Sequence, residues 1–126
     1  MTTRDFEGLV ERAQFGADGL LPAIIQEEGT GVVLMLAWMD VEALRRTLEG
    51  GLVTFWSRSR QEYWRKGDTS GNYLKMTSVA LDCDADAVLV TVVPVSAACH
   101  TGAHSCFDGH GAVEIHGAVH MNGAGQ

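Results

Sequence analysis

The spacing of apolar residues along the chain predicts two helices and five strands. In two segments apolar residues recur every three or four positions and a glycine follows, which is typical of amphipathic helices. The first helix is expected to be capped by Thr2 or Thr3 and to end by Gly16. The second is expected to begin after the N-cap Asp40 and to end at Gly50. Apolar runs predict strands at residues 21–26, 32–39, 52–57, 73–81 and 87–93.

These elements predict an α+β fold, with a strand-dominated antiparallel sheet and two helices. The run at 32–39 barely alternates, so we expect that strand to be buried on both faces. A chain of 126 residues fits one domain. We expect it to span 1–126, with a core at about 20–107 and a glycine- and histidine-rich tail at 108–126.

Composition narrows the class of protein. No apolar run approaches the ~20 residues of a membrane span, and the N-terminus lacks the apolar core of a signal peptide. We therefore expect a cytoplasmic protein without membrane contact. A net charge of -7 argues against nucleic-acid binding. All nine Lys and Arg lie at or before Lys75, and residues 51–75 hold five of them against two acids, a local charge of +3. This distribution suggests a site for a small phosphorylated molecule.

The basic residues are concentrated in the segment 57–72, which offers several kinds of phosphate ligand. Guanidinium groups match phosphate oxygens, glycine and hydroxyl residues supply donors, and a tryptophan can stack on a base. The candidates are Arg58, Arg60, Trp64, Lys66, Gly67, Thr69 and Ser70. The alternative is a set of exposed arginines and a core tryptophan. No Walker or dinucleotide fingerprint is present, so this segment alone does not specify a function.

All three cysteines, Cys83, Cys99 and Cys106, lie within residues 81–107. In a cytosolic protein they are better interpreted as metal ligands than as a disulfide framework. Three thiolates with one open position are typical of catalytic zinc. Two alternatives remain open: three buried reduced thiols, or a structural zinc with His100 or His104 as fourth ligand.

Three carboxylates, Asp82, Asp84 and Asp86, alternate around Cys83. If this stretch is a strand, the carboxylates share one face and the thiol lies on the other. Carboxylates suit magnesium, so the stretch predicts two neighbouring metal sites; the alternative is a solvated acidic turn. His100, beside Cys99, is a candidate general acid or base. A zinc ligand or a loop hydrogen bonder is an equally good interpretation of this histidine.

Taken together, these segments resemble the phosphoribosyl-AMP cyclohydrolase family of histidine biosynthesis. The matching segments, in the family's order, are LMLAWM at 34–39, EALRRTL at 42–48, FWSRSR at 55–60, WRKGDTSGN at 64–72, LDCDAD at 81–86 and CHTGAHSCF at 99–107. Some relatives carry a fused phosphoribosyl-ATP pyrophosphohydrolase domain. The 19 residues after Phe107 (126 minus 107) are too few for one, so we expect the monofunctional form.

The resemblance implies a homodimer that opens the adenine ring of 1-(5-phosphoribosyl)-AMP at the N1–C6 bond, using a zinc-activated water. It implies zinc ligands at Cys83, Cys99 and Cys106, with one zinc per subunit shared across the dimer interface, and magnesium ligands at Asp82, Asp84 and Asp86. Two competing classes remain. A nucleobase deaminase normally shows H-x-E with P-C-x-x-C, and neither motif occurs here. A non-enzymatic zinc module is the other.

Overall fold

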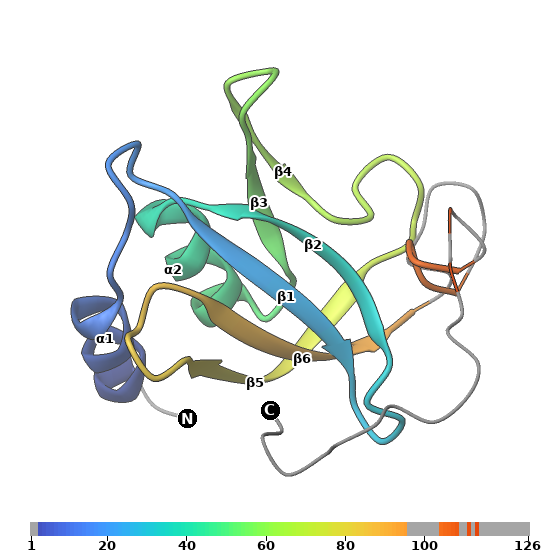
Figure 1. The fold of residues 1–126 in the computed structure, drawn as a ribbon, viewed down its shortest axis with the longest axis horizontal. Coiled ribbons are helices and arrows are strands. Elements are labelled where there is room, and N and C mark those ends of the chain that lie inside the picture. The colour runs from blue at the N-terminus through green and yellow to red at the C-terminus, as the bar shows by residue number, and fades with distance from the viewer. Residues whose placement is uncertain (1–2, 96–103, 109–110, 112, 114–126) are drawn as a thin grey trace, which may run out of the picture.

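The computed structural model describes residues 3–95, 104–108, 111 and 113. Two helices and a strand-dominated arrangement confirm the predicted α+β class (Figure 1). The elements are α1 (Thr3–Arg12), β1 (Leu21–Glu27), β2 (Val33–Met39), α2 (Val41–Gly50), β3 (Thr54–Ser57), β4 (Glu62–Arg65), β5 (Leu74–Leu81) and β6 (Val88–Pro94). Neither of these two helices is long and apolar enough to cross a membrane.

Four strands form the main sheet in the order β2-β1-β6-β5. Neighbouring strands are antiparallel except β1 and β6, which pair in parallel from Ala23↔Val88 to Glu27↔Val92. The sheet is therefore mixed rather than purely antiparallel. A parallel pair needs a long crossover, and here the chain from β2 to β5 supplies it. Strand patterns do not indicate the pairing of segments so far apart in the sequence.

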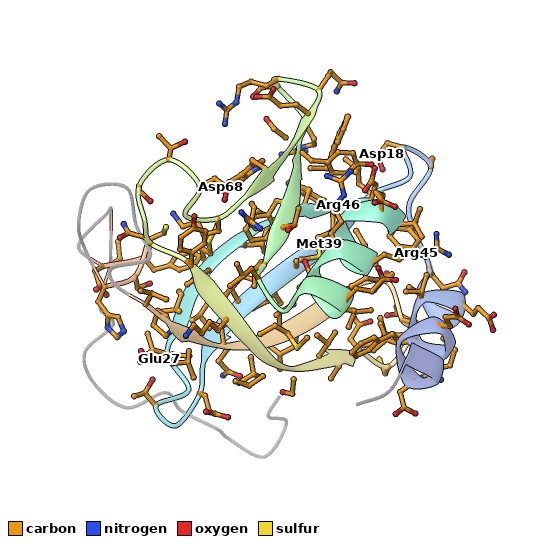
Figure 2. The ribbon with its side chains drawn as sticks, turned by 180° about the vertical axis from the view of Figure 1, so that it is seen from behind. Asp18, Glu27, Met39, Arg45, Arg46 and Asp68 are labelled. Atoms are coloured by element: carbon orange, nitrogen blue, oxygen red, sulfur yellow. The ribbon has the colours of Figure 1, made fainter. Side chains whose placement is uncertain are left out.

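The core lies between one face of this sheet and α2. Alternate residues of the two central strands, such as Ile25 and Val90, are fully buried, and Leu44 and Leu48 of α2 belong to the same core. Seen from behind, α2 lies across the sheet (Figure 2). The helix begins where its cap predicts, since the Asp40 carboxylate accepts a hydrogen bond from the Ala43 backbone N–H at 2.8 Å. The first helix, α1, also contributes to the core, which thus extends before residue 20.

The opposite face of the sheet is apolar but exposed. Leu36 on β2 pairs with Ile24 on β1, which pairs with Leu89 on β6. Leu36 is 46% exposed and Val33 39% exposed, so the prediction that this strand is buried on both faces is wrong for the single chain. The strand lacks polar alternation because its outer side also carries apolar residues.

A separate two-stranded hairpin, β3–β4, carries the basic segment. The sequence predicted β3 but not β4. An isolated hairpin is marginally stable, so its contacts with α2 matter. The hydroxyl of Tyr63 donates to the Asp40 carboxylate at 2.6 Å, and the Arg46 guanidinium lies 4.3 Å from the Tyr63 ring centroid. The bond to Asp40 raises the pKa of Tyr63 to about 12. These contacts fix the hairpin against the start and middle of α2.

Candidate active site

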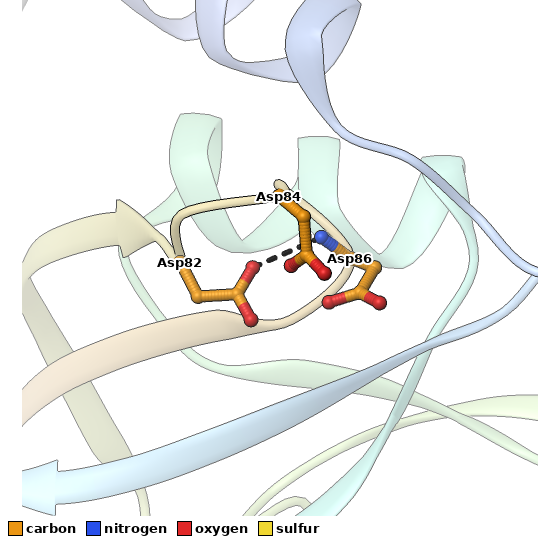
Figure 3. A group of neighbouring side chains, drawn as sticks. All are labelled: Asp82, Asp84 and Asp86. Carbon is orange, nitrogen blue, oxygen red and sulfur yellow. Dashed lines mark hydrogen bonds between the residues drawn. The ribbon is translucent and has the colours of Figure 1, made fainter.

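The three aspartates converge in a turn between β5 and β6, not on a strand as the sequence predicted. The strand β5 ends at Leu81, and Ala85 adopts a left-handed conformation with φ 63°. One oxygen of Asp82 accepts hydrogen bonds from the backbone N–H groups of Asp86, at 3.0 Å, and Ala87, at 3.2 Å (Figure 3). This capture of backbone donors folds the chain into a loop instead of extending it.

The folded turn still brings the three carboxylates together. One ligand oxygen from each of Asp82, Asp84 and Asp86 lies within 4.8 Å of the others. In the described part of the chain this is the only cluster of three His, Cys, Asp or Glu side chains close enough to hold one ion. A hydrogen bond that the protonated Asp86 carboxyl donates to Asp84 raises the pKa of Asp86 to about 6, and accepting that bond lowers the pKa of Asp84. Carboxylates this close repel one another when all are ionised, and a divalent cation among them would relieve that repulsion.

The segment carrying Cys106 docks on the free edge of β2. The backbone N–H of Cys106 donates to the Leu34 carbonyl at 2.7 Å, and the buried Ser105 hydroxyl donates to the Val33 carbonyl at 2.7 Å. His104 lies 3.1 Å from Glu27, at the end of β1. The His104 contact, after the larger effect of a hydrogen bond from Thr30, lowers the pKa of Glu27.

Cys83 lies far from Cys106 in the same chain. It is exposed in the acidic turn, whose Ala85 carbonyl accepts from the Gln14 N–H just after α1. Figure 1 shows this turn beside α1 and the segment 104–108 at the other end of the sheet. From β2 to β5 the sheet alone spans three strand spacings, roughly 14 Å. Two sulfurs on one zinc lie at most about 4.6 Å apart, so one chain cannot bring both to one ion.

Cys83 is exposed in the acidic turn, and Cys106 is half-buried beside β2. Sulfur donors of this kind suit zinc, and given their separation a zinc held by both would take Cys83 and Cys106 from different chains. The predictions for Cys99 and His100 lie outside the described residues, as does most of the predicted tail.

The basic segment forms a hollow of about 550 Å³ beside β4. Six of the seven residues predicted to bind substrate line it: Arg60, Trp64, Lys66, Gly67, Thr69 and Ser70. Arg58, the seventh, lines a neighbouring hollow of about 590 Å³. Lys66 is 8% exposed, and Arg60 lies 3.6 Å from Glu62. The structure therefore brings most of the predicted residues into one place, with cationic, hydroxyl and aromatic groups together.

Comparison with known proteins explains this combination. The model of the family described as phosphoribosyl-AMP cyclohydrolase matches residues 35–108, which include the hairpin, the acidic turn and Cys106. A phosphoribosyl-AMP cyclohydrolase of Clavibacter sepedonicus is 62% identical over 104 residues, covering 82% of this chain and 75% of that protein. One from Streptomyces avermitilis is 65% identical over 100 residues, covering 79% of this chain and 75% of the relative.

This chain belongs to the phosphoribosyl-AMP cyclohydrolase family. It is therefore an enzyme of the hydrolase class, and the non-enzymatic zinc module is excluded. The resemblance drawn from the sequence segments is confirmed. The family acts in histidine biosynthesis, and its matched region contains every candidate site residue named above.

Two residues of this cyclohydrolase family member escaped the sequence interpretation. Trp38 lies under the Arg58 guanidinium, 4.5 Å from ring centroid to the central carbon. Ser105 anchors the segment beside Cys106 through its buried hydroxyl. Both belong to segments that carried the resemblance, at 34–39 and 99–107. Neither residue is charged, and neither lies at a spacing typical of metal ligands, so nothing in the sequence indicated a functional role.

We predict that Gly67→Ala destabilises the enzyme more than Gly71→Ala. Both glycines have positive φ, at 102° and 80°, so alanine strains either position by roughly 1 kcal/mol. A Cβ on Gly67 would also lie 2.5 Å from the Tyr73 backbone nitrogen, whereas nothing lies within 4 Å at Gly71. The crowding adds about 1–3 kcal/mol. Urea unfolding measures the difference, and equal losses of stability at the two positions would contradict the crowding.

We also predict that magnesium raises the melting temperature at about pH 7.5 but not at about pH 5. The folded-state pKa of Asp86 is raised from 3.8 to about 6. Its contribution to stability is thus present below the unfolded-state value and is lost as pH rises through the folded-state value. Above that pH a cation can replace the missing proton. Calorimetric melting with and without Mg²⁺ measures this shift.

The matched variant for this experiment is Asp84→Asn, which removes one charge and keeps the shape. We expect it to weaken the magnesium response and leave the zinc content unchanged, because Cys83 is not part of the carboxylate cluster. A variant that loses zinc but keeps its magnesium response would show that the two sites are not separate. If magnesium raised the melting temperature equally at the two pH values, its binding would not depend on the loss of the Asp86 proton, and the prediction would be wrong.

Proposed function

We propose that this chain hydrolyses the N1–C6 bond in the adenine ring of 1-(5-phosphoribosyl)-AMP and yields the formimino carboxamide ribotide. One observation carries the proposal. Six residues expected to bind a phosphoribosyl nucleotide line one hollow, in a chain whose relatives are named phosphoribosyl-AMP cyclohydrolases. The ribosyl group on N1 makes the adenine ring electron-poor, which opens C6 to attack by water.

In this proposal the hairpin and the loop after it bind the substrate. The Lys66 ammonium and the donors of Gly67, Thr69 and Ser70 face a phosphate, and Trp64 stacks on the base. Phe55 supports Trp64 from the paired strand, with ring centroids 4.8 Å apart. Since phosphate contacts persist from ground state to transition state, these residues lower KM more than they raise kcat.

The reaction needs a nucleophile at neutral pH, and we assign the zinc ligands Cys83, Cys99 and Cys106 to that purpose. A bound zinc supplies Lewis acidity, which lowers the pKa of a water molecule toward about 7. His100 then acts as the general acid or base that moves the proton between the water and the leaving nitrogen.

We propose that the enzyme works as a homodimer, with Cys83 of one chain and Cys99 and Cys106 of the other around each zinc. The separation of Cys83 and Cys106 at opposite ends of one sheet supports a two-chain site. The exposed apolar face of the sheet supports it independently. Ile24, Leu36 and Leu89 occupy paired positions on that face, and exposed apolar patches of this kind mark protein interfaces.

The acidic turn of Asp82, Asp84 and Asp86 is the proposed magnesium site. Magnesium binds through one or two carboxylates together with waters and substrate phosphates. Its role here is to orient the substrate, not to replace the zinc. We propose a cytoplasmic location for the enzyme, in keeping with reduced thiol ligands.

The proposal is tested by following turnover of phosphoribosyl-AMP after removal of zinc. Treatment with a chelator is expected to abolish turnover, and zinc added back is expected to restore it. Magnesium added alone is the control and is not expected to restore it. Turnover that survives complete zinc removal, verified by elemental analysis, would contradict the assigned role of the thiolates.

A further inference from the structure

Two hollows adjoin in this structure, and Trp64 lines both of them. The first, here called the lysine hollow, contains Lys66 and the loop 67–70. The second, called the tryptophan hollow, is lined by Trp38, Trp56, Arg58 and Trp64, among others. Their volumes are similar, at about 550 Å³ and about 590 Å³. Each hollow thus contains one or more cations of the basic segment and opens beside the same aromatic ring.

The basic residues in and around the two hollows differ in their partners. Arg46, Arg60 and Arg65 each form an ion pair with a nearby acid. Among the described residues, neither Arg58 nor Lys66 has a carboxylate partner. A cation without an acidic partner keeps its full charge for a ligand, so Arg58 and Lys66 are the strongest anion-binding candidates among the cations that line the two hollows.

Trp38 accounts for the position of Arg58. The guanidinium lies 4.5 Å from the Trp38 ring centroid, within the range of a cation–π interaction. The arginine otherwise extends from an exposed turn, and a long side chain there would sample many rotamers. Stacking on Trp38 leaves the edge of the guanidinium open, and the edge is where its N–H donors form bidentate bonds to phosphate.

The two cations come from opposite ends of the hairpin. The Lys66 N–H donates to the Val53 carbonyl at 3.0 Å, so Lys66 is level with Val53. Ser57 lies four residues beyond Val53, roughly 13 Å along the strand, and Arg58 directly follows Ser57. Trp64 pairs with Phe55, between these two levels. The order along the hairpin is therefore cation, aromatic ring, cation.

We propose that Trp38 is a positioning residue, which holds Arg58 as the second of two phosphate-binding cations. The two hollows then hold the two phosphates of a nucleotide that is phosphorylated at both ends, with its base over Trp64. This inference rests on the proposed substrate. In 1-(5-phosphoribosyl)-AMP the phosphoribosyl groups are attached to N1 and N9, at opposite ends of the purine, and this arrangement matches the order of groups on the hairpin.

The first test uses ribose 5-phosphate as a probe with a single phosphate. Isothermal titration of the intact protein is expected to give two bound equivalents per chain. Arg58→Ala and Trp38→Leu are each expected to lose the same equivalent, and Lys66→Ala the other. Trp38→Phe keeps an aromatic face and is expected to retain both. Arg45→Ala, which removes an exposed arginine of α2 outside both hollows, is the matched control.

The second test separates binding from chemistry. Trp38→Leu is expected to raise KM for phosphoribosyl-AMP roughly tenfold, with kcat changed less than about twofold, because a cation–π contact of this size affects binding. Thermal melting verifies that the variants are folded. The inference is overturned if a folded Trp38→Leu keeps both equivalents and its KM. It is also overturned if Arg58→Ala and Lys66→Ala abolish one and the same equivalent.

The inference and the proposed function can fail separately. Binding of ribose 5-phosphate does not require turnover, so two equivalents with the expected losses support the two hollows even if phosphoribosyl-AMP is not hydrolysed. Turnover of phosphoribosyl-AMP with a single bound equivalent would instead support the function and refute the second phosphate site.

Discussion

Mixing Cys83→Ala chains with Cys106→Ala chains is expected to restore the zinc binding and turnover that each variant lacks by itself. In a mixed dimer, one site joins both mutated positions and is broken twice. The other joins the intact Cys83 of one chain to the intact Cys99 and Cys106 of the other. Half of randomly exchanged dimers are mixed and each carries one intact site of two, so about one quarter of the wild-type activity should return.

The control for this experiment replaces the second partner with a Cys83→Ala, Cys106→Ala double variant. Both sites of that mixed dimer lack Cys83, so no activity should return. The geometry behind the prediction is the position of Cys83 beside α1 and of Cys106 on the β2 edge. An inactive mixture in which heterodimers have been verified would mean that the site is not shared.

Cys106→Ala alone is expected to abolish zinc binding and turnover together. Structural zinc sites provide about 10–16 kcal/mol from four ligands, so one lost thiolate costs roughly 3 kcal/mol, a more than hundredfold loss of affinity. Docking of the segment should survive, because the backbone N–H at this position donates to the Leu34 carbonyl and alanine retains it. Elemental analysis and steady-state kinetics measure the two effects.

Zinc-free wild-type protein is the reference for this variant. Equal melting temperatures of the zinc-free proteins would show that the substitution removes a ligand and not the fold. A variant with full zinc content and full activity would refute Cys106 as a ligand.

Local signals in the sequence predicted local structure well. Asp40 caps α2 as expected, and Gly51 ends it in a left-handed conformation with φ 77°. The pairing of strands that lie far apart in the sequence was harder to predict. The parallel pairing of β1 with β6 depends on how the whole chain packs, and β4 is a short strand of four residues with two aromatic residues between two charged ones. Its signal is weaker than that of the long apolar runs.

For the site, the types of residue predicted which side chains come together, whereas the predicted backbone conformation was wrong at the aspartates. The three aspartates were predicted on a strand, yet they converge because Asp82 binds backbone N–H groups and closes a turn. The hollow around Lys66 follows a continuous segment, so the sequence indicated most of its lining. Trp38 comes from a different strand, and only the fold brings its ring under Arg58.

The most direct test of the account is the product formed from phosphoribosyl-AMP in water labelled with heavy oxygen. Ring opening at N1–C6 predicts a product that has gained one water molecule, with the labelled oxygen on the new carboxamide and no ammonia released. Nuclear magnetic resonance and mass spectrometry measure both features. Release of ammonia with the purine ring still closed would identify a deaminase and contradict the proposed reaction.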